Sequence, residues 1–167
     1  MTIAEFDHLD ITVKKELLQK CCGSSSWVNK MLPVFPVNDL IDLLEYADEK
    51  WNECTQEDWQ EAFEHHPMIG DVQTLKEKFS SSADWASDEQ SGVQQTSKEI
   101  SEAISVGNRL YREKFGFIFI IYATGKSVQE MLSSLQKRLL NNPENEIKIA
   151  ADEQIRITKK RLEKLFI

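Results

Sequence analysis

Most of the six glycines and four prolines in this chain stand between segments whose apolar residues recur every three or four positions. That spacing places apolar side chains on one face of an α-helix, and the glycines and prolines end the helices. The pattern predicts an all-α fold: a compact single-domain bundle of about seven or eight helices over residues 1–167. The expected helices cover residues 12–22, 27–32, 39–51, 56–63, 72–79, 86–114, 128–141 and 143 to the end.

Several of these segments follow side chains that can accept hydrogen bonds from a first helical turn. Ser26, Asn38, Thr55 and Ser127 are the expected N-caps. Asn142-Pro143 supplies an N-cap followed by proline at the first helical position, where its missing N–H costs nothing.

Residues 115–123 (FGFIFIIYA) form the one stretch with the aromatic and β-branched composition of a strand. No other segment offers a partner strand, and a lone strand leaves its backbone hydrogen bonds unsatisfied. We therefore expect a buried irregular or partly helical segment that lines another part of the structure.

The overall composition, with 41% hydrophobic and 29% charged residues, is typical of a soluble protein. A formal net charge of −8 and the lack of a basic block disfavour nucleic acid as a partner. No apolar stretch approaches the roughly 20 residues that cross a bilayer, and the start lacks a secretory leader, so we expect no membrane partner and a cytoplasmic location. The three cysteines match neither a disulfide framework nor a zinc pattern, and reduced core thiols are expected.

Two charged residues lie within apolar helical stripes. Because a helix turns about 100° per residue, Arg161 falls between Ile157 and Leu165 on the inner face of the last helix. Glu89 lies one turn before Val93 on the apolar face of the long helix. A buried charge is costly unless it is paired, so each residue alone is better explained by a structural ion pair than by a site.

His66 changes that balance. A histidine, an acid and an arginine are the groups needed to bind an anion and move a proton, and His66, Glu89 and Arg161 supply them. The sequence permits these three side chains to converge but does not show that they do. His8 and His65 are equally plausible titrating groups.

Other site chemistries have less support. A metal site of His65, His66 and Asp71 is disfavoured because adjacent histidines point in different directions and the spacing matches no familiar site. No nucleophile-elbow motif supports a serine or cysteine nucleophile.

Short motifs along nearly the whole chain are similar, in the same order, to those of the 2-oxo-4-hydroxy-4-carboxy-5-ureidoimidazoline (OHCU) decarboxylases. Residues 66–70 (HPMIG) resemble the family's HPxIG motif, and residues 85–92, with Glu89-Gln90, resemble its serine-x-x-Glu-Gln segment. Each motif is short, but the ordered set is specific. The resemblance extends over residues 21–27, 108–109, 115–117, 123–127, 138–141 and 146–162.

The resemblance implies an all-helical enzyme, without cofactor or metal, that removes CO2 from the ureide OHCU to give (S)-allantoin in urate catabolism. It implies that His66 is the catalytic acid/base, that Glu89 and Arg161 complete the catalytic set, and that Gln90 contacts the substrate. A homodimer is an expectation from the resemblance alone. The remaining substrate-binding positions that it implies are Pro67, Ala86, Ser87, Asp88, Phe119, Ile120, Ile121, Tyr122 and Ala123.

The chain departs from the family pattern at two places. Ala86 stands where the family has serine, so either the adjacent Ser87 supplies that hydroxyl or the hydrogen bond is absent. Ile118 stands where many relatives have proline, a difference that affects only local backbone shape.

Two alternative functions remain open at this point. A helical binding module could dock a partner through exposed tryptophans, and a hydrolase of another ureide would keep the pocket but change the reaction. For the decarboxylase, we expect His66 to carry the proton because the ordinary histidine pKa of about 6.5 suits neutral pH. The candidate docking tryptophans are Trp27, Trp51, Trp59 and Trp85.

Overall fold

The computed structural model describes residues 1–69 and 90–166, with the side chains of residues 90–96 left out. The described residues form eight α-helices and one short 3-10 helix and contain no strand, which confirms the predicted all-helical fold. The chain divides into two compact units. The first comprises Met1–His66 with Ile149–Ile167, and the second comprises Pro67–Lys148.

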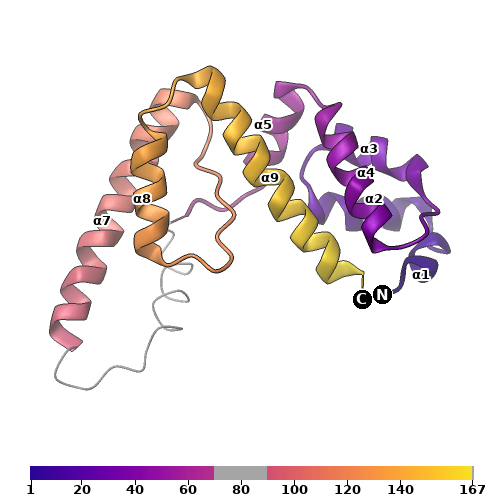
Figure 1. Cartoon of the computed structure of the whole chain (residues 1–167), viewed down its shortest axis with the longest axis horizontal. Helices are drawn as coiled ribbons and strands as arrows, with labels where there is room; N and C mark the ends of the chain where they lie inside the picture. The colour runs from indigo at the N-terminus through magenta and orange to yellow at the C-terminus, as the bar shows by residue number, and fades with distance from the viewer. Residues whose placement is uncertain (70–89, 167) are drawn as a thin grey trace. The chain divides into compact units, whose positions relative to one another are not determined.

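The first unit is built from short helices and most of the last helix, α9 (Pro143–Leu165). Its two ends meet, because the Met1 ammonium donates to the carbonyl oxygen of Leu165 at 3.1 Å (Figure 1). The other elements of this unit are α1 (Ile3–Asp7), α2 (Ile11–Cys21), α3 (Ser25–Met31), η1 (Leu32–Val34), α4 (Leu40–Asn52) and α5 (Gln56–Glu64).

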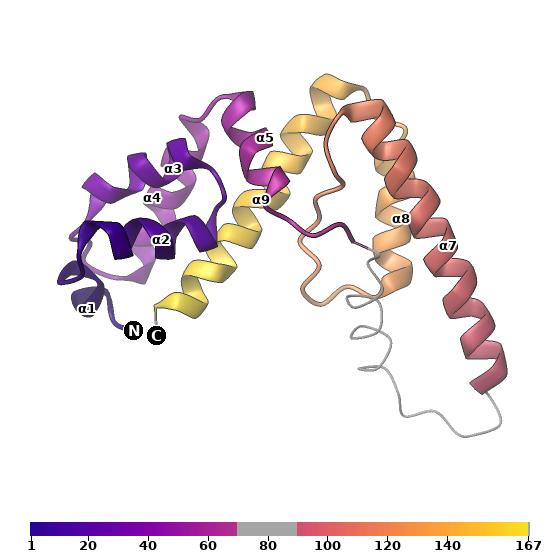
Figure 2. The same cartoon turned by 180° about the vertical axis from the view of Figure 1, so that it is seen from behind.

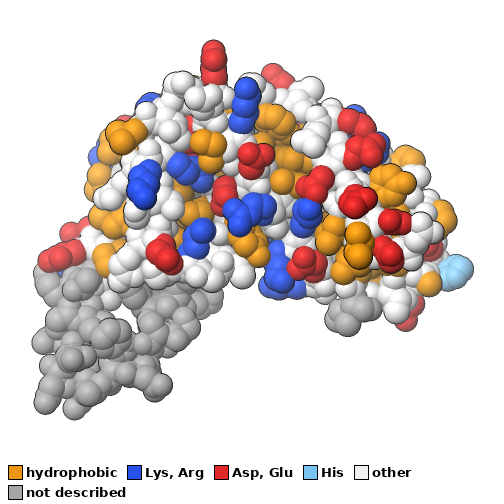
Figure 3. All heavy atoms as spheres, viewed as in Figure 1, with side chains coloured by type: hydrophobic (Ala, Val, Ile, Leu, Met, Phe, Trp, Pro, Cys, Tyr) orange, Lys and Arg blue, Asp and Glu red, His pale blue; other side chains and the backbone are white. Residues whose placement is uncertain are grey.

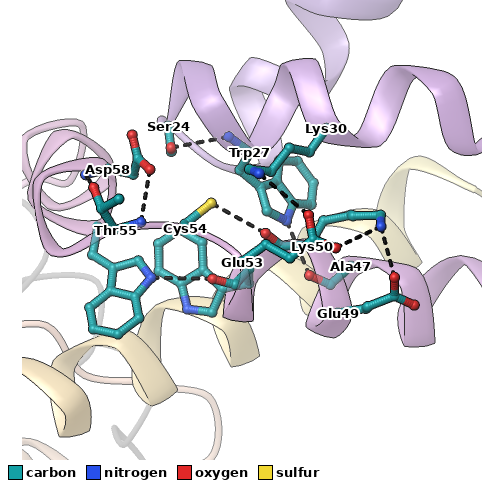
Figure 4. Close-up of polar contacts among 12 residues, drawn as sticks. Ser24, Trp27, Lys30, Ala47, Glu49, Lys50, Glu53, Cys54, Thr55 and Asp58 are labelled. Atoms are coloured by element: carbon teal, nitrogen blue, oxygen red, sulfur yellow. Dashed lines mark hydrogen bonds and ion pairs between the residues drawn. The ribbon is translucent and has the colours of Figure 1, made fainter.

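Tryptophan side chains connect the helices of this unit through hydrogen bonds and packing. Trp27 is fully buried and donates its indole N–H to the carbonyl oxygen of Ala47 at 3.1 Å (Figure 4). Trp51 is 2% exposed and donates in the same way to Ala151 on α9 at 3.0 Å. Trp59 is half-buried against Trp51. Trp27 and Trp51 therefore belong to the core rather than to a docking surface, Trp59 is half-buried beside Trp51, and Trp85 lies outside the described residues.

Helix caps confirm part of the local prediction and correct the rest. Thr55 begins α5 in a reciprocal capping box with Asp58 (Figure 4), and Ser127 begins α8 in the same way. Two predicted caps were wrong: Ser24 rather than Ser26 begins α3, and Asp39 rather than its neighbour Asn38 begins α4. In both cases a second acceptor side chain stood within two residues, so local pattern alone could not choose between them.

Helix lengths also differ in places from the expectation. The α1 helix was not predicted, and α8 ends at Arg138 rather than at Asn141. The α9 helix begins at Pro143 as expected, with the Asn142 side chain accepting from a backbone N–H at 2.9 Å. The predicted helix over residues 72–79 lies outside the described residues.

The second unit is organised around α7 (Gln90–Phe115) and α8 (Val128–Arg138), which lie side by side (Figures 1 and 2). They run in the same direction, since Lys114 at the end of α7 donates to the carbonyl oxygens of Leu139 and Asn141 just after α8, each at 2.7 Å. Two parallel helices need a connection that travels back along their length, and extended chain covers that distance in few residues.

Residues 116–127 are that connection, and residues 118–123 within it are neither helix nor strand. Gly116 and Gly125 flank the segment with φ values of 81° and 76°, a left-handed backbone that suits glycine. Phe119, Ile120 and Ile121 are buried. The prediction of a buried irregular segment is therefore confirmed.

None of the described helices combines the length and the apolar character needed to cross a lipid bilayer. On the face drawn in Figure 3, acidic and basic side chains are interspersed rather than gathered into a block of one sign.

Candidate active site

His66 lies just beyond the end of α5, in the first unit. Its backbone N–H donates to the carbonyl oxygen of Phe63 at 3.2 Å, which continues the turn that His65 begins as C-cap. The side chain is half-buried, and its Nε2 lies 2.6 Å from Oε1 of Gln154 on α9. The fold therefore holds this imidazole against a helix that is 88 residues away in sequence.

Arg161, also on α9, lies on the other side of the imidazole. Its Nη2 is 3.5 Å from Nδ1 of His66. Its Nη1 faces the carbonyl oxygens of Cys21 and Lys20 at 3.2 and 3.4 Å, at the end of α2. These carbonyl oxygens have no hydrogen-bond partners within their own helix and lie at the negative end of its dipole. They therefore interact favourably with a positively charged guanidinium. Arg161 is thus half-buried, and its guanidinium lies between the end of α2 and His66.

The charge state of His66 differs from the expectation. Burial, and secondly the positive charge of Arg161, lower the pKa of His66 to about 4, while the hydrogen bond with Gln154 opposes the shift. The side chain is therefore neutral at neutral pH. The ordinary pKa of about 6.5 expected from the sequence is wrong for the unliganded protein, because it ignores the desolvation of the charged form; the role of His66 as proton carrier stays a prediction.

A cavity of about 700 Å³ opens beside Arg161, among α2 and α3. Lys15, Lys20 and Arg161 line it with three positive charges, against one carboxylate, that of Glu16. His66 does not line the cavity. Arg161 lines the cavity and also contacts His66, so its guanidinium adjoins both the cavity and the imidazole. A hollow of this size and charge suits a small anion.

The cysteines are buried and free, as expected. Burial raises the pKa of Cys21 and Cys54 to about 11 and that of Cys22 to about 12, so all three are protonated thiols and poor nucleophiles. Among the residues that the structure describes, no three histidine, cysteine or acidic side chains cluster as a metal ion would require.

In the second unit, a buried ion pair anchors the irregular segment that the resemblance assigns to substrate binding. Arg138 lies 2.6 Å from Oε1 of Glu146 and donates to the carbonyl oxygen of Ile120 at 2.6 Å. Its guanidinium stacks on the ring of Phe119 at 4.5 Å, and Tyr111 donates its hydroxyl to the same carboxylate. The position of the Ile120 backbone is therefore set by a charged hydrogen bond rather than by regular secondary structure.

The structure describes some of the predicted site residues and not others. It brings His66 and Arg161 together. Pro67 is exposed at the start of the second unit, which also holds the segment from Phe119 to Ala123. Gln90 begins α7, but its side chain is not described. The remaining predicted positions lie outside the described residues: Ala86, Ser87, Asp88 and Glu89.

Sequence reasoning assigned no role to two residues that support the site. Gln154 lies beside Arg161 on the helical wheel of the last helix, and the structure shows its side chain fully buried against His66. Arg138 lies inside the apolar stripe of α8, the same kind of position that singled out Arg161 in the sequence.

The fold and the pairing of a neutral histidine with an arginine define a helical protein with a candidate acid/base site. Comparison with known families makes that class specific. The profile described as "OHCU decarboxylase" matches residues 7–163, and the chain belongs to the OHCU decarboxylase family.

Known relatives agree with this assignment. The chain is 36% identical over 146 residues to the "Uric acid degradation bifunctional protein TTL" of Arabidopsis thaliana, which covers 87% of this chain and 45% of that protein. It is 24% identical over 163 residues to the "Uric acid degradation bifunctional protein PucL" of Bacillus subtilis, covering 96% of this chain and 32% of that protein. The chain therefore spans less than half the length of these curated relatives.

Two solved structures share the fold. The "OHCU decarboxylase in the presence of (S)-allantoin" matches with a TM-score of 0.74 and 33% identity, over 91% of this chain and 97% of that one. The "(S)-allantoin synthase" matches with a TM-score of 0.72 over 99% of this chain and 54% of that one; its 15% identity shows similarity of fold only.

Proposed function

We propose that this chain catalyses the decarboxylation of OHCU to (S)-allantoin, in the degradation of urate, without a cofactor. The observation that carries the proposal is the contact between His66 and Arg161, the two predicted catalytic residues that the structure describes, in a chain that matches the family from residue 7 to 163. The related proteins named for uric acid degradation and the related decarboxylase crystallised with (S)-allantoin support the same substrate and product.

The chemistry that the site must perform is simple in outline. The bond between the ring carbon and the carboxylate breaks, and its electron pair moves into the ring, where the imine nitrogen takes it up with a proton. The neighbouring carbon then gains a proton while the hydroxyl becomes a carbonyl and loses one. One proton is consumed for each CO2 released, and the ring itself accepts the electrons, so no separate electron sink is required.

His66 and Arg161 have complementary parts in this scheme. Neutral His66 takes the hydroxyl proton on its unprotonated ring nitrogen and returns it to one face of the substrate ring, which makes the product a single enantiomer. Arg161 balances the substrate's negative charge as that charge moves from the carboxylate into the ring. A bound anion also offsets the positive charge beside His66, so substrate binding makes the imidazole easier to protonate.

The other predicted positions complete the proposal by resemblance. Glu89 orients His66 or holds the ureido N–H groups, and Gln90 reads an amide edge of the substrate. Ser87 supplies the hydroxyl that the family's serine provides, because Ala86 stands at the position of that serine. Pro67, Asp88 and the chain from Phe119 to Ala123 form the walls of a dry pocket, which favours loss of CO2 by removing water from the carboxylate.

The activity can be tested by starting from urate and following the chirality of allantoin with and without this protein. We expect rapid formation of (S)-allantoin only when the protein is present. Slow racemic allantoin in both samples would exclude the decarboxylase activity. Conversion of a different ureide, with no effect on OHCU, would support the hydrolase alternative instead.

Variants test the two named residues. His66→Ala should fold and lose most of kcat, about a hundredfold or more for a lost acid/base group, whereas His8→Ala removes an exposed histidine of α1's C-cap and should keep wild-type turnover. Arg161→Leu should mainly raise KM. Near wild-type kcat in His66→Ala, or an unchanged kcat/KM in Arg161→Leu, would contradict the roles assigned to these residues.

We also propose that the protein acts as a homodimer, as the resemblance implies, and in the cytoplasm, as expected from the sequence. Sedimentation equilibrium measures the oligomeric state directly, and a monomer at micromolar concentration would contradict the dimer. Fractionation of the source cells tests the compartment.

A further inference from the structure

A chain of hydrogen bonds leads from His66 into the core of the first unit. Oε1 of Gln154 lies 2.6 Å from Nε2 of His66, and Nε2 of Gln154 donates to Oγ1 of Thr158 at 3.1 Å. Gln154 and Thr158 have no exposed surface. Buried polar groups are costly to leave unpaired, so this arrangement tolerates few alternatives.

One neighbour of the imidazole is a hydrogen-bond acceptor and the other is a donor, so one ring nitrogen must be protonated and the other must not be. A carbonyl oxygen can only accept, so the nitrogen facing Gln154 must carry a hydrogen. A guanidinium can only donate, so the nitrogen facing Arg161 must offer a lone pair. The histidine tautomer with hydrogen on Nε2 satisfies both neighbours, whereas the tautomer with hydrogen on Nδ1 satisfies neither.

Turning the Gln154 amide over would not rescue the other tautomer. Its NH2 group would then face Nε2 while Arg161 still faced Nδ1, and the single ring hydrogen of a neutral imidazole would meet a donor on either nitrogen. The reversed amide would also turn its carbonyl oxygen to Thr158, whose hydroxyl would then have to donate to it.

We propose that Gln154 and Thr158 are positioning residues that hold His66 as the Nε2–H tautomer and so leave Nδ1 as the atom that takes up and returns the proton. The role of Nδ1 in turnover rests on the proposed function, but the tautomer itself is a property of the unliganded protein and can be measured without substrate. Among the described residues, the charged or titratable groups that act on the ring are Arg161 and His65.

Nitrogen NMR of the full chain labelled with 15N-histidine measures the tautomer directly. The chain has only three histidines, and a His66→Gln variant assigns the signals of His66 by their loss. At pH 7 we expect a protonated, pyrrole-type signal for Nε2 and an unprotonated, pyridine-type signal for Nδ1. The reverse pattern, or the averaged signals of a tautomer mixture, would overturn the inference.

Paired substitutions test whether Gln154 and Thr158 are the cause. Thr158→Val keeps the shape but removes the hydroxyl that fixes the amide, so we expect the His66 signals to move toward a mixture, while Thr158→Ser should keep the wild-type pattern. Gln154→Glu places a carboxylate at Nε2 and should raise the midpoint of the His66 titration. Wild-type signals in folded Thr158→Val, or an unmoved midpoint in folded Gln154→Glu, would contradict the positioning role.

Kinetics separate this role from a merely structural one. Gln154→Leu should lower kcat by about tenfold, as loss of an outer partner of a site residue commonly does, with KM changed less than about twofold. An equal loss in kcat and in the amount of folded protein would indicate a structural role only. If the wild-type protein lacks decarboxylase activity, the proposed function fails, while the NMR result still decides the tautomer.

Discussion

Single residues show how burial changes chemistry in this protein. In the folded state the pKa of His66 falls to about 4 because the ring loses water and faces Arg161, whereas in the unfolded chain it returns to the ordinary value of 6.5. Between these two pH values the unfolded chain binds more protons than the folded one. The contribution of His66 to stability is therefore complete above pH 6.5 and is lost as the pH falls toward 4.

This difference predicts an acid-sensitive term in folding. Between pH 7 and pH 5, the free energy of unfolding of the wild type should fall by about 1 to 2 kcal/mol more than that of His66→Gln, because the glutamine at position 66 does not titrate. Urea denaturation followed by circular dichroism at the two pH values measures both. Equal losses in the two proteins would show that His66 is not desolvated in the folded chain.

At the scale of helices and their connections, a buried ion pair between Arg138 and Glu146 holds the irregular segment of the second unit in place. Arg138 on α8 pairs with Glu146 on α9 and fixes the carbonyl of Ile120, and Asn141 donates to the second carboxylate oxygen at 2.8 Å. Glu146 has no exposed surface. These contacts fix the backbone of the connection between α7 and α8, although it forms neither helix nor strand.

Removing one charge from this pair should be far more costly than removing one from a surface pair. Glu146→Gln leaves the buried Arg138 without its counter-charge, and we expect a loss of about 3 kcal/mol or more in unfolding free energy. Glu113→Gln is the matched control, because its pairing with Arg109 has side chains 60% and 63% exposed. That change should cost less than about 0.5 kcal/mol. Similar losses in the two variants would contradict a stabilising buried pair.

At the scale of the whole molecule, one helix contributes to both units. The first residues of α9 belong to the second unit and include Glu146, while the rest belongs to the first and includes Gln154 and Arg161. The boundary between the units falls between Lys148 and Ile149, within this helix. The continuity of α9 is therefore expected to matter for the stability of the entire chain.

Proline at the boundary tests that continuity. Lys148 is exposed, so Lys148→Pro removes no packing, but it deletes a helical hydrogen bond and clashes with the preceding turn. We expect a loss of about 3 kcal/mol or more in unfolding free energy by urea denaturation. Lys148→Ala keeps the helix and should change stability by less than about 0.5 kcal/mol. An unchanged Lys148→Pro protein would show that the helix is not needed intact.

How far the sequence predicted the structure depends on the range of the interaction. The N-caps Thr55 and Ser127 bond to residues three positions away and were predicted. The choice of Ser24 over Ser26 was not, since both can cap. Residues 115–123 were predicted to be buried and irregular or partly helical because no partner strand existed, and the structure confirms a mostly buried irregular segment after Phe115. Its anchoring by Arg138 depends on contacts with residues distant in sequence.

For the candidate site, the helical wheel by itself determined that Arg161 faces inward, and the motif around His66 determined the family resemblance. Only the tertiary structure decided that these two side chains, 95 residues apart, meet, that Gln154 holds the other ring nitrogen, and that His66 is neutral. The reason is physical. Periodicity follows from local backbone geometry, whereas a pKa and a tautomer depend on the water that a side chain has lost and on the neighbours that replaced it.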